Sequence, residues 1–465
     1  MACLFTAHSG SCGWRQGLRL SIINTREQRR TCGSVTHRVV QHARAVLCAG
    51  TSAGSQGLAV KKIIPLHSAD TQFVSTILSQ HEVVAHLMAG DKEVSVASPE
   101  ANSRARWYVD AMQRQEGTAN GPSIFRESVA NFVTHRDDME TSLDSIVLTS
   151  GSWPSARALL QVLLGASQDA VVLLPSPGPP AYRETSASMG QLGVSYLVDD
   201  NDWNRTVSDL SQTLLELRQK QRHPRALVVA NPSLSGRLIP KTAIDALLEL
   251  AHGQGLSIIA QEDSLATTGR TDVVSFRNAA REMGLAVPVF SCFSACAYTG
   301  QNEGYIVCDF VPHDMISHLH AVVESPTLKS QAWLASLLTP WASQESCVDK
   351  VVQTADRNAR LLSKLAGVEG IRCPLVESGA HALPRIIIKG FVMKKAISLA
   401  TPADQIYCLE MVSRTGVITS PGSGFGQRPG FFHFRISLMH EEATFVAALE
   451  HIKQFHAKHP TGWFR

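Results

Sequence analysis

No long apolar run occurs in this chain. A helix that crosses a membrane needs roughly 18 or more consecutive apolar residues, whereas the longest apolar stretches here, such as Ala170–Leu174, have the length of strands. Hydrophobic residues make up 44% of the 465 residues and charged residues 18%, which is typical of a globular protein. We therefore expect no membrane span, and a chain of this length can bury a core large enough for two domains.

Paired cysteines are also missing. The ten cysteines include no Cys-x-x-Cys motif, and four of them lie within the first 62 residues. Cys292 and Cys296, four residues apart, are more typical of small apolar side chains at a strand end than of a metal or redox pair. We expect neither a disulfide framework nor a metal site.

Acidic residues are scarce at the N-terminus. Residues 1–62 contain seven arginines and two lysines against one acid, Glu27, a balance of +8, so the remaining residues carry −5 of the overall +3. An Arg-rich, Ser-rich and acid-poor segment is typical of a transit peptide, so we predict a mitochondrial location. The alternative is a disordered basic segment that binds an acidic or nucleic-acid partner. Any contact with nucleic acid would have to come from this segment, because the rest of the chain is mildly acidic.

Predicted strands and helices alternate through the middle of the chain. The strands are expected at 145–149, 170–174, 226–230, 256–260, 287–292 and 304–308, and the helices at 123–135, 154–164, 182–190 and 241–252. This alternation predicts an α/β fold, with a mostly parallel sheet covered by helices on both faces. Chemically active side chains are then expected at the carboxyl ends of the strands.

The pattern changes after about residue 336. Helices are expected at 346–365, 403–415 and 441–456, and strands at 383–388, 416–419 and 431–437, which predicts a smaller α+β domain. We therefore expect four parts: a transit peptide or basic segment at 1–62, an N-terminal segment at 63–125, a large domain at 126–335 and a small C-terminal domain at 336–465.

The segment Pro421–Arg435, with the sequence PGSGFGQRPGFFHFR, resembles the C-terminal signature of alanine aminotransferases. These enzymes belong to the class I and II aminotransferases, which use pyridoxal phosphate (PLP). The resemblance extends from about Arg104 to Lys458 and includes Ile124–Val129, Leu148–Gly151, Pro177–Tyr182, Arg225–Pro232 and Gly379–Arg385. It implies a fold-type-I PLP transferase, with a mostly parallel seven-stranded sheet in the large domain and a smaller α+β C-terminal domain.

The resemblance places a cysteine where the family has its catalytic lysine. The family strand leads into Ser-x-Ser-Lys-Gly-Tyr, and the matching run Phe293–Tyr298 reads FSACAY, so Cys296 takes the lysine position. No lysine occurs between Lys241 and Lys329. A thiol cannot form the protonated imine that carries the cofactor, nor supply the amine base for the proton shift. Ordinary transamination is therefore not expected.

The residues that would contact the cofactor ring depart from the family pattern as well. The resemblance puts Gln261 in place of the carboxylate that keeps the pyridine nitrogen protonated, and Ser264 in place of a tyrosine. Glu262 or Asp263 would replace that carboxylate only if the strand were re-registered. Two further family positions, an asparagine and a stacking aromatic, fall on Leu234 and Pro179.

The phosphate site is partly kept. At its turn Gly151 and Ser152 persist, but Trp153 stands where the family has a serine. The family's phosphate-binding arginine has no counterpart, because Thr299–Gly304 contains no basic residue.

Arg435 matches the family's arginine that binds the substrate carboxylate. This arginine either lines a retained pocket for an anion or is paired inside the domain and contributes to packing. We favour the second interpretation.

We therefore expect an aminotransferase-like pseudoenzyme with Cys296 at the lysine position and no bound cofactor. Enzymatic activity is left open, with a preference for none. The predicted role is a structural or regulatory subunit of a mitochondrial assembly, as a homodimer or part of a larger complex. Two alternatives stay open: an active PLP-dependent alanine:2-oxoglutarate transaminase, and a non-catalytic binder of PLP or an anionic metabolite.

Overall fold

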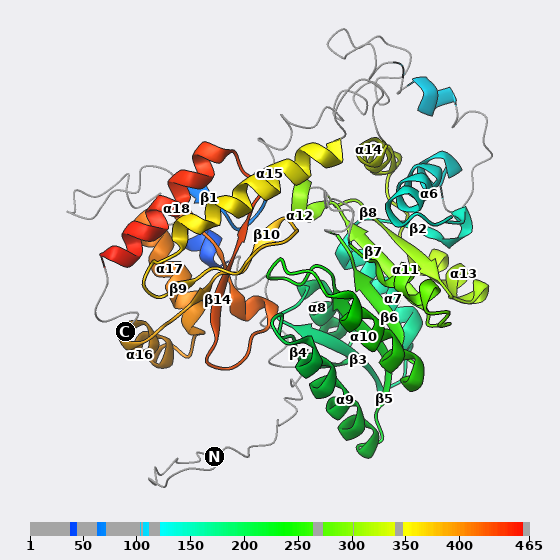
Figure 1. Ribbon diagram of the computed structural model, residues 1–465, viewed down its shortest axis with the longest axis horizontal. Coiled ribbons are helices and arrows are strands. Elements are labelled where there is room, and N and C mark those ends of the chain that lie inside the picture. The colour runs from blue at the N-terminus through cyan, green and yellow to red at the C-terminus, as the bar shows by residue number, and fades with distance from the viewer. Residues whose placement is uncertain are drawn as a thin grey trace.

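The computed structural model describes residues 38–43, 63–70, 103, 106–110, 121–263, 273–300, 302–339 and 347–458. Its elements form two groups that lie side by side in Figure 1, one built on a large sheet (mostly green) and one on a small sheet (yellow to red). Of the predicted N-terminal segment 1–62, only residues 38–43 lie within the described ranges.

The large sheet has seven strands in the order β2-β8-β7-β6-β5-β3-β4. Their bounds are β2 Ile146–Thr149, β3 Ala170–Ser176, β4 Leu192–Leu197, β5 His223–Ala230, β6 Ser257–Gln261, β7 Val289–Ser294 and β8 Gly304–Asp309. All neighbouring strands are parallel except β8, which runs antiparallel to both β2 and β7. The predicted α/β fold with a mostly parallel seven-stranded sheet is confirmed.

Both faces of the large sheet are buried. Along β3, Val171 and Leu173 join one hydrophobic cluster, whereas Val172 and Leu174 join another. This alternation follows from the two-residue period of a strand, and it explains why β3 is an unbroken apolar run. Helices α9 Trp203–Gln219, α10 Lys241–Gln254 and α11 Phe276–Glu282 pack on the first face, and α7 Ser152–Leu164, α8 Pro180–Ser188 and α13 His313–Val322 on the second.

The small sheet has the order β10-β14-β11-β9, with β13 also paired to β14. Its strands are β9 Ile371–Arg372, β10 His381–Ala382, β11 Arg385–Ile386, β13 Ser420–Pro421 and β14 Phe432–Ser437. The strand expected at 383–388 is therefore wrong in its bounds. Its first residues lie between two short strands, at Leu383 and Pro384, because proline cannot donate to a ladder.

Helices cover the small sheet and connect the two groups. They include α15 Cys347–Leu361, α16 Gly390–Ser398, α17 Ala403–Thr415 and α18 Glu442–Ala457, together with α6 Ser123–Asp137 and α14 Leu328–Leu338 beside the large sheet. A separate pair joins β1 Ile64–Pro65 to β12 Val417–Ile418 in parallel. One continuous hydrophobic cluster contains residues from both groups, such as Phe125, Phe293 and Phe434.

A buried ionic network lies beside the large sheet. Arg277, which is 0% exposed, donates from Nε to Asp309 at 2.6 Å and from Nη1 to Asp137 at 2.9 Å. Arg136 donates to Asp137, and Arg281 donates to Asp309. Each buried carboxylate thus has two arginine partners.

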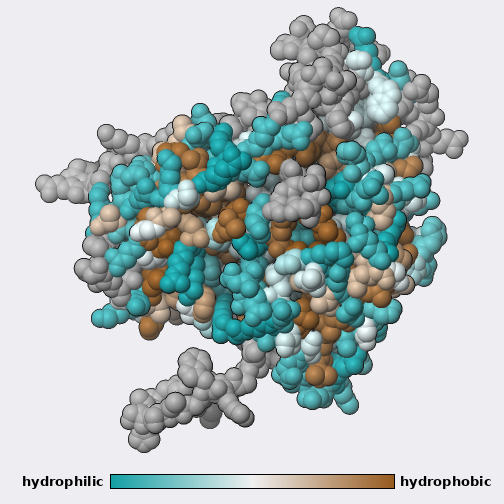
Figure 2. All heavy atoms as spheres, in the orientation of Figure 1, coloured by the Kyte–Doolittle hydropathy of each residue, from teal (hydrophilic) through white to brown (hydrophobic). Residues whose placement is uncertain are grey.

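The visible surface is mixed in character. Hydrophilic side chains cover much of the outer rim in Figure 2, and hydrophobic ones show between them in smaller patches. Among the helices in the described part of the chain, none combines the length and the apolar character that a bilayer crossing requires.

Candidate functional site

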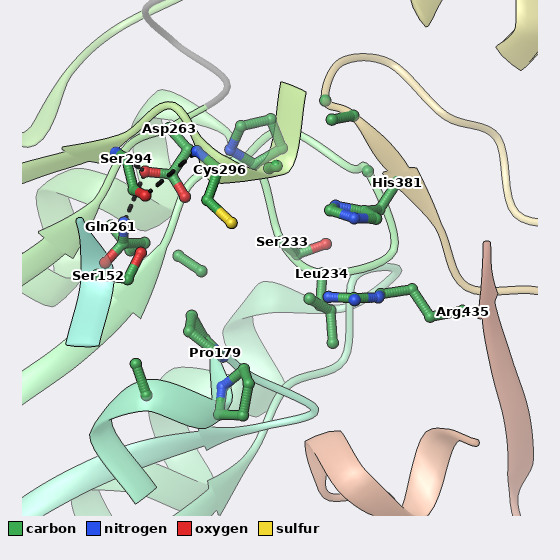
Figure 3. A pocket seen from close by; sticks show the side chains of 18 of the residues that line it. Ser152, Pro179, Ser233, Leu234, Gln261, Asp263, Ser294, Cys296, His381 and Arg435 are labelled. Carbon is green, nitrogen blue, oxygen red and sulfur yellow. Dashed lines mark hydrogen bonds between the residues drawn. The ribbon is translucent and has the colours of Figure 1, made fainter. Parts of the chain in front are cut away.

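A cavity of about 510 Å³ lies where the carboxyl ends of β5, β6 and β7 face the small sheet. Ligand pockets in proteins are typically about 300–1,000 Å³, so this volume suits a small organic molecule. The large-sheet group supplies most of the wall, and His381 and Arg435 reach it from the other side (Figure 3). Its position at the strand ends agrees with the expectation from the sequence.

Most of the predicted site residues lie around this one cavity. The structure places seven of the nine in its wall: Ser152, Trp153, Pro179, Leu234, Gln261, Cys296 and Arg435. Gly151 lies next to the wall as the N-cap of α7. Ser264 lies outside the described residues. The roles assigned to these positions remain predictions.

The N-terminus of α7 forms one end of the cavity. Gly151 has a φ of 91°, and a Cβ there would lie 3.3 Å from Ser294 Oγ, so glycine suits this turn. The first backbone N–H groups of a helix have no partner within it and attract anions. Trp153 is 45% exposed, so the bulk expected in this turn lies partly in solvent. Neither lysine nor arginine lines this end among the described residues.

A hydrogen-bonded chain crosses the cavity wall at the end of β6. The Tyr182 hydroxyl donates to Gln261 Oε1 at 2.8 Å, and Gln261 Nε2 donates to Asp263 Oδ1 at 2.6 Å. The backbone N–H of Ser294 donates to the same Asp263 oxygen at 2.6 Å. Desolvation raises the pKa of Asp263 to about 7, although these two hydrogen bonds lower it. This carboxyl can therefore hold a proton near neutral pH.

Asp263 corrects one expectation from the sequence. We expected it to reach the site only through a shifted strand register, but β6 pairs regularly with β7, with Gln261 opposite Cys292. Asp263 lines the same cavity as Gln261 because residues two apart share a face of an extended chain. That spacing was the signal in the sequence that could have identified it. Glu262 faces the opposite way, where its Oε1 accepts the backbone N–H of Phe276.

Cys296 begins the short helix α12, Cys296–Thr299, directly after β7. Its sulfur points into the cavity in Figure 3. Desolvation, followed by the negative charge of Asp263, raises the pKa of this thiol above its ordinary value. The thiol is therefore protonated at neutral pH and is a poor nucleophile. Lysine is absent from the described residues that line the cavity.

Arg435 provides the fixed positive charge of this cavity. It lies on β14, its Nη2 donates to the His67 carbonyl at 3.4 Å, and its guanidinium lies 4.5 Å from the Phe425 ring centre. Nearby, burial lowers the pKa of His67 to about 4 and also lowers that of His381. Both rings are neutral near pH 7. Because Arg435 is packed against the protein and also lines the cavity, both interpretations of it stay compatible with its surroundings.

Comparisons with known proteins agree with this arrangement. Residues 112–452 match the family model described as Aminotransferase class I and II. "Alanine aminotransferase 2, mitochondrial" of Arabidopsis thaliana is 27% identical over 360 residues, which are 73% of this chain and 66% of that one. "Probable alanine aminotransferase, mitochondrial" of Dictyostelium discoideum is 24% identical over 380 residues, 76% of this chain and 71% of that one.

Solved structures show the same fold. The alanine aminotransferase of Pyrococcus furiosus superposes with a TM-score of 0.67 and 16% identity, covering 93% of this chain and 99% of that one. An aspartate aminotransferase of Thermotoga maritima gives a TM-score of 0.65, 16% identity and coverages of 91% and 96%. At these identities the likeness concerns the fold alone.

The family match corrects the expectation that no cofactor is bound. Relatives in this family depend on PLP, so the match points to PLP binding, and the expectation is wrong. The residues that line the cavity fit PLP in part. The cavity has sufficient volume, the α7 N-terminus suits a phosphate, and the buried Nδ1 of His67 has no hydrogen-bond partner among the described residues. A covalent attachment point is what the described wall lacks.

Proposed function

The chain belongs to the aminotransferase class I and II family, and from this premise we propose that it binds PLP noncovalently and does not transaminate through a lysine. One observation carries the proposal: Cys296, at the start of α12, lines the cavity with a protonated thiol, and no lysine is among the described residues of the wall. A pseudoenzyme role follows from this chemistry, since neither imine formation nor amine base catalysis is open to a thiol.

Different residues of the cavity would contact different parts of the cofactor. Ser152, with the first N–H groups of α7, would hold the phosphate, and Ser294 lines the cavity beside that helix end. Gln261 and Asp263 supply hydrogen-bonding groups at the end of β6, and Pro179 supplies an apolar wall. PLP, when bound, supplies an aldehyde and an electron-withdrawing ring. Arg435 would bind a carboxylate in the same cavity.

Location and assembly are part of the same proposal. The basic composition of residues 1–62 and the word "mitochondrial" in the names of two relatives support a mitochondrial location. We also infer a division into an N-terminal segment at 63–125, a large domain at 126–335 and a small domain at 336–465. We infer that the chain acts as a homodimer or within a larger assembly. Its role there would be structural or regulatory and would need no lysine chemistry.

Calorimetric titration with PLP and with pyridoxamine 5′-phosphate tests the proposal. The second ligand lacks the aldehyde, so without a covalent link both should bind with dissociation constants within about threefold of each other. Cys296→Phe puts a bulky ring on the cavity wall and should weaken both by about tenfold or more. The matched change Ser363→Phe, at an exposed residue outside this cavity, should leave both affinities unchanged.

Two results would contradict the proposal. Preferential binding of PLP, with a borohydride-stable adduct on one lysine and turnover of alanine with 2-oxoglutarate, would support the active transaminase instead. Absence of heat with either ligand would exclude noncovalent binding in this cavity.

A further inference from the structure

A second cavity of about 490 Å³ lies between the end of β4 and the small sheet. It shares no lining residue with the first cavity. Its charged lining residues come from both sides: Asp199, Asp200, Arg205, Asp209 and Arg237 from the large-sheet group, and Arg372, Arg385 and Arg428 from the small-sheet group.

Three basic residues form a row across the small sheet. Arg385 on β11 lies directly opposite Arg372 on β9 and directly opposite His433 on β14. Directly opposite residues of antiparallel strands have Cβ atoms roughly 4.5–5.5 Å apart, and like charges in such a pair are destabilising. All three residues line the second cavity. Desolvation and then the charge of Arg372 lower the pKa of Arg385, and burial lowers that of His433 to about 4.

An aromatic ring holds two arginines in place. The Arg385 guanidinium lies 3.9 Å from the centre of the Phe431 ring, and that of Arg428 lies 5.3 Å from the same centre. Stacking of this kind fixes the plane of a guanidinium without using its hydrogen-bond donors. The Nε atom of Arg385 is buried and has no hydrogen-bond partner among the described residues.

No described carboxylate oxygen lies within 4.0 Å of a nitrogen of Arg372, Arg385 or Arg428. The acids of the facing wall have other partners. Asp209 pairs with Arg205 at 3.9 Å, and Asp200 accepts the Ser235 hydroxyl. Of the five lining arginines, Arg205 thus has an acidic partner, and Arg237 pairs with Glu377 at 3.4 Å. The other three, which we call the arginine cluster, thus converge on the cavity without a neutralising partner of their own.

We propose that the arginine cluster binds the phosphate group of a small organic phosphate. A phosphate offers three oxygens to several guanidinium groups at once, and Arg–phosphate hydrogen bonds are charge-assisted and often bidentate. A bound dianion would also relieve the repulsion between Arg372 and Arg385. A single carboxylate offers only two oxygens and fits a convergence of three arginines less well.

The rest of the cavity indicates what the phosphate is attached to. Phosphate alone does not need about 490 Å³. Asp199 and Asp200, which accept hydrogen bonds, line the wall opposite the small sheet together with Ser176. A hydroxyl- or amine-bearing body joined to the phosphate would satisfy both walls. The ligand class is therefore a polar phosphate monoester or diphosphate.

Titration calorimetry with inorganic pyrophosphate tests this site. We expect binding to the wild-type protein that persists in Cys296→Phe, because that change fills the first cavity only. Arg385→Gln should weaken binding by about tenfold or more, as loss of a charge-assisted bidentate contact does. Arg428→Gln, a change at an exposed residue that leaves the sheet intact, should weaken it in the same direction.

The matched control is Arg222→Gln, which removes the same charge at an exposed arginine paired with Asp169. It should change the affinity by less than about twofold. Equal losses in Arg222→Gln and Arg385→Gln would overturn the proposal, because the effect would then reflect net charge. Absence of pyrophosphate binding would overturn it too, as would tighter binding of malonate than of pyrophosphate, which would assign the cluster to carboxylates.

Discussion

The two cavities of this protein differ in how their charge is arranged. The first is lined by the neutral side chains of Gln261 and Cys296, by Asp263 with its pKa raised to about 7, and by one arginine, Arg435, among the described residues. In the second, three arginines converge with no carboxylate within 4.0 Å among the described residues. Among these residues, the first cavity therefore has a single arginine, whereas three arginines without a carboxylate partner favour an anion in the second.

The largest loss of stability is expected for an arginine that has ion-pair partners, in the buried network beside the large sheet. Arg277→Met removes the cation shared by Asp309 and Asp137, leaving two buried carboxylates with fewer partners. Breaking a buried pair in this way costs about 3–5 kcal/mol. Urea unfolding should show that loss in the free energy of unfolding. Arg281→Met, whose side chain is 41% exposed, should cost about 1 kcal/mol or less. Equal losses in the two variants would mean that burial does not set the value of these pairs.

A smaller effect concerns the pH dependence contributed by Asp263. Its pKa is raised from 3.8 to about 7, so between these values the folded protein holds a proton that the unfolded chain has released. Binding of this proton stabilises the folded state. Its contribution to the free energy of unfolding is fully present below about pH 3.8, and it falls by at most about 1.4 kcal/mol per pH unit as the pH rises to about 7.

The measurement is the difference in free energy of unfolding between the wild type and Asp263→Asn from pH 4 to 8. Asparagine keeps an oxygen for Gln261 and Ser294 but does not titrate. The variant should gain relative to the wild type as the pH rises to about 7, and the difference should then be constant. Burial also raises the pKa of Glu303 to about 7, but that group contributes equally to both proteins. A difference that does not change with pH would show that Asp263 is ionised throughout.

The smallest change in stability is expected for an arginine that has no ion-pair partner among the described residues. Without added anion, Arg372→Gln should raise the free energy of unfolding by about 0.2–1 kcal/mol, because it removes the repulsion with Arg385 across the strands. Arg222→Gln should lower it by about 0–1 kcal/mol, because a surface ion pair is lost. A clear loss of stability in Arg372→Gln would show that Arg372 supports the fold through contacts of its own.

Elements bounded by strong local signals could be predicted from the sequence. Helix α17 occupies the expected residues 403–415, because Pro402 precedes it and Gly416, with a φ of 77°, ends it. Strand β4 was not predicted, because Gly193 and Ser195 interrupt its apolar residues. The following helix α9 was not predicted either, although Asp202 caps it by accepting the backbone N–H of Arg205.

The first cavity was largely foreseeable and the second was not. Family motifs mark Ser152, Gln261 and Cys296 as neighbours although they are far apart in the sequence. No motif relates Arg372, Arg385 and His433. Their alignment depends on the register of three strands, and two of those strands are only two residues long. Periodicity cannot predict so short a pairing.

The most direct test of the noncovalent proposal is borohydride reduction of the PLP-saturated protein, followed by peptide mapping. We predict no stoichiometric adduct on any lysine of the wild type. Denaturation should release the whole cofactor, as PLP without borohydride and as its alcohol, pyridoxine 5′-phosphate, after borohydride reduction of the aldehyde. Cys296→Lys restores an amine at the end of β7 and should yield about one adduct per chain at residue 296. A single stoichiometric adduct in the wild type would contradict the account, because a lysine from elsewhere in the chain would then occupy the cavity.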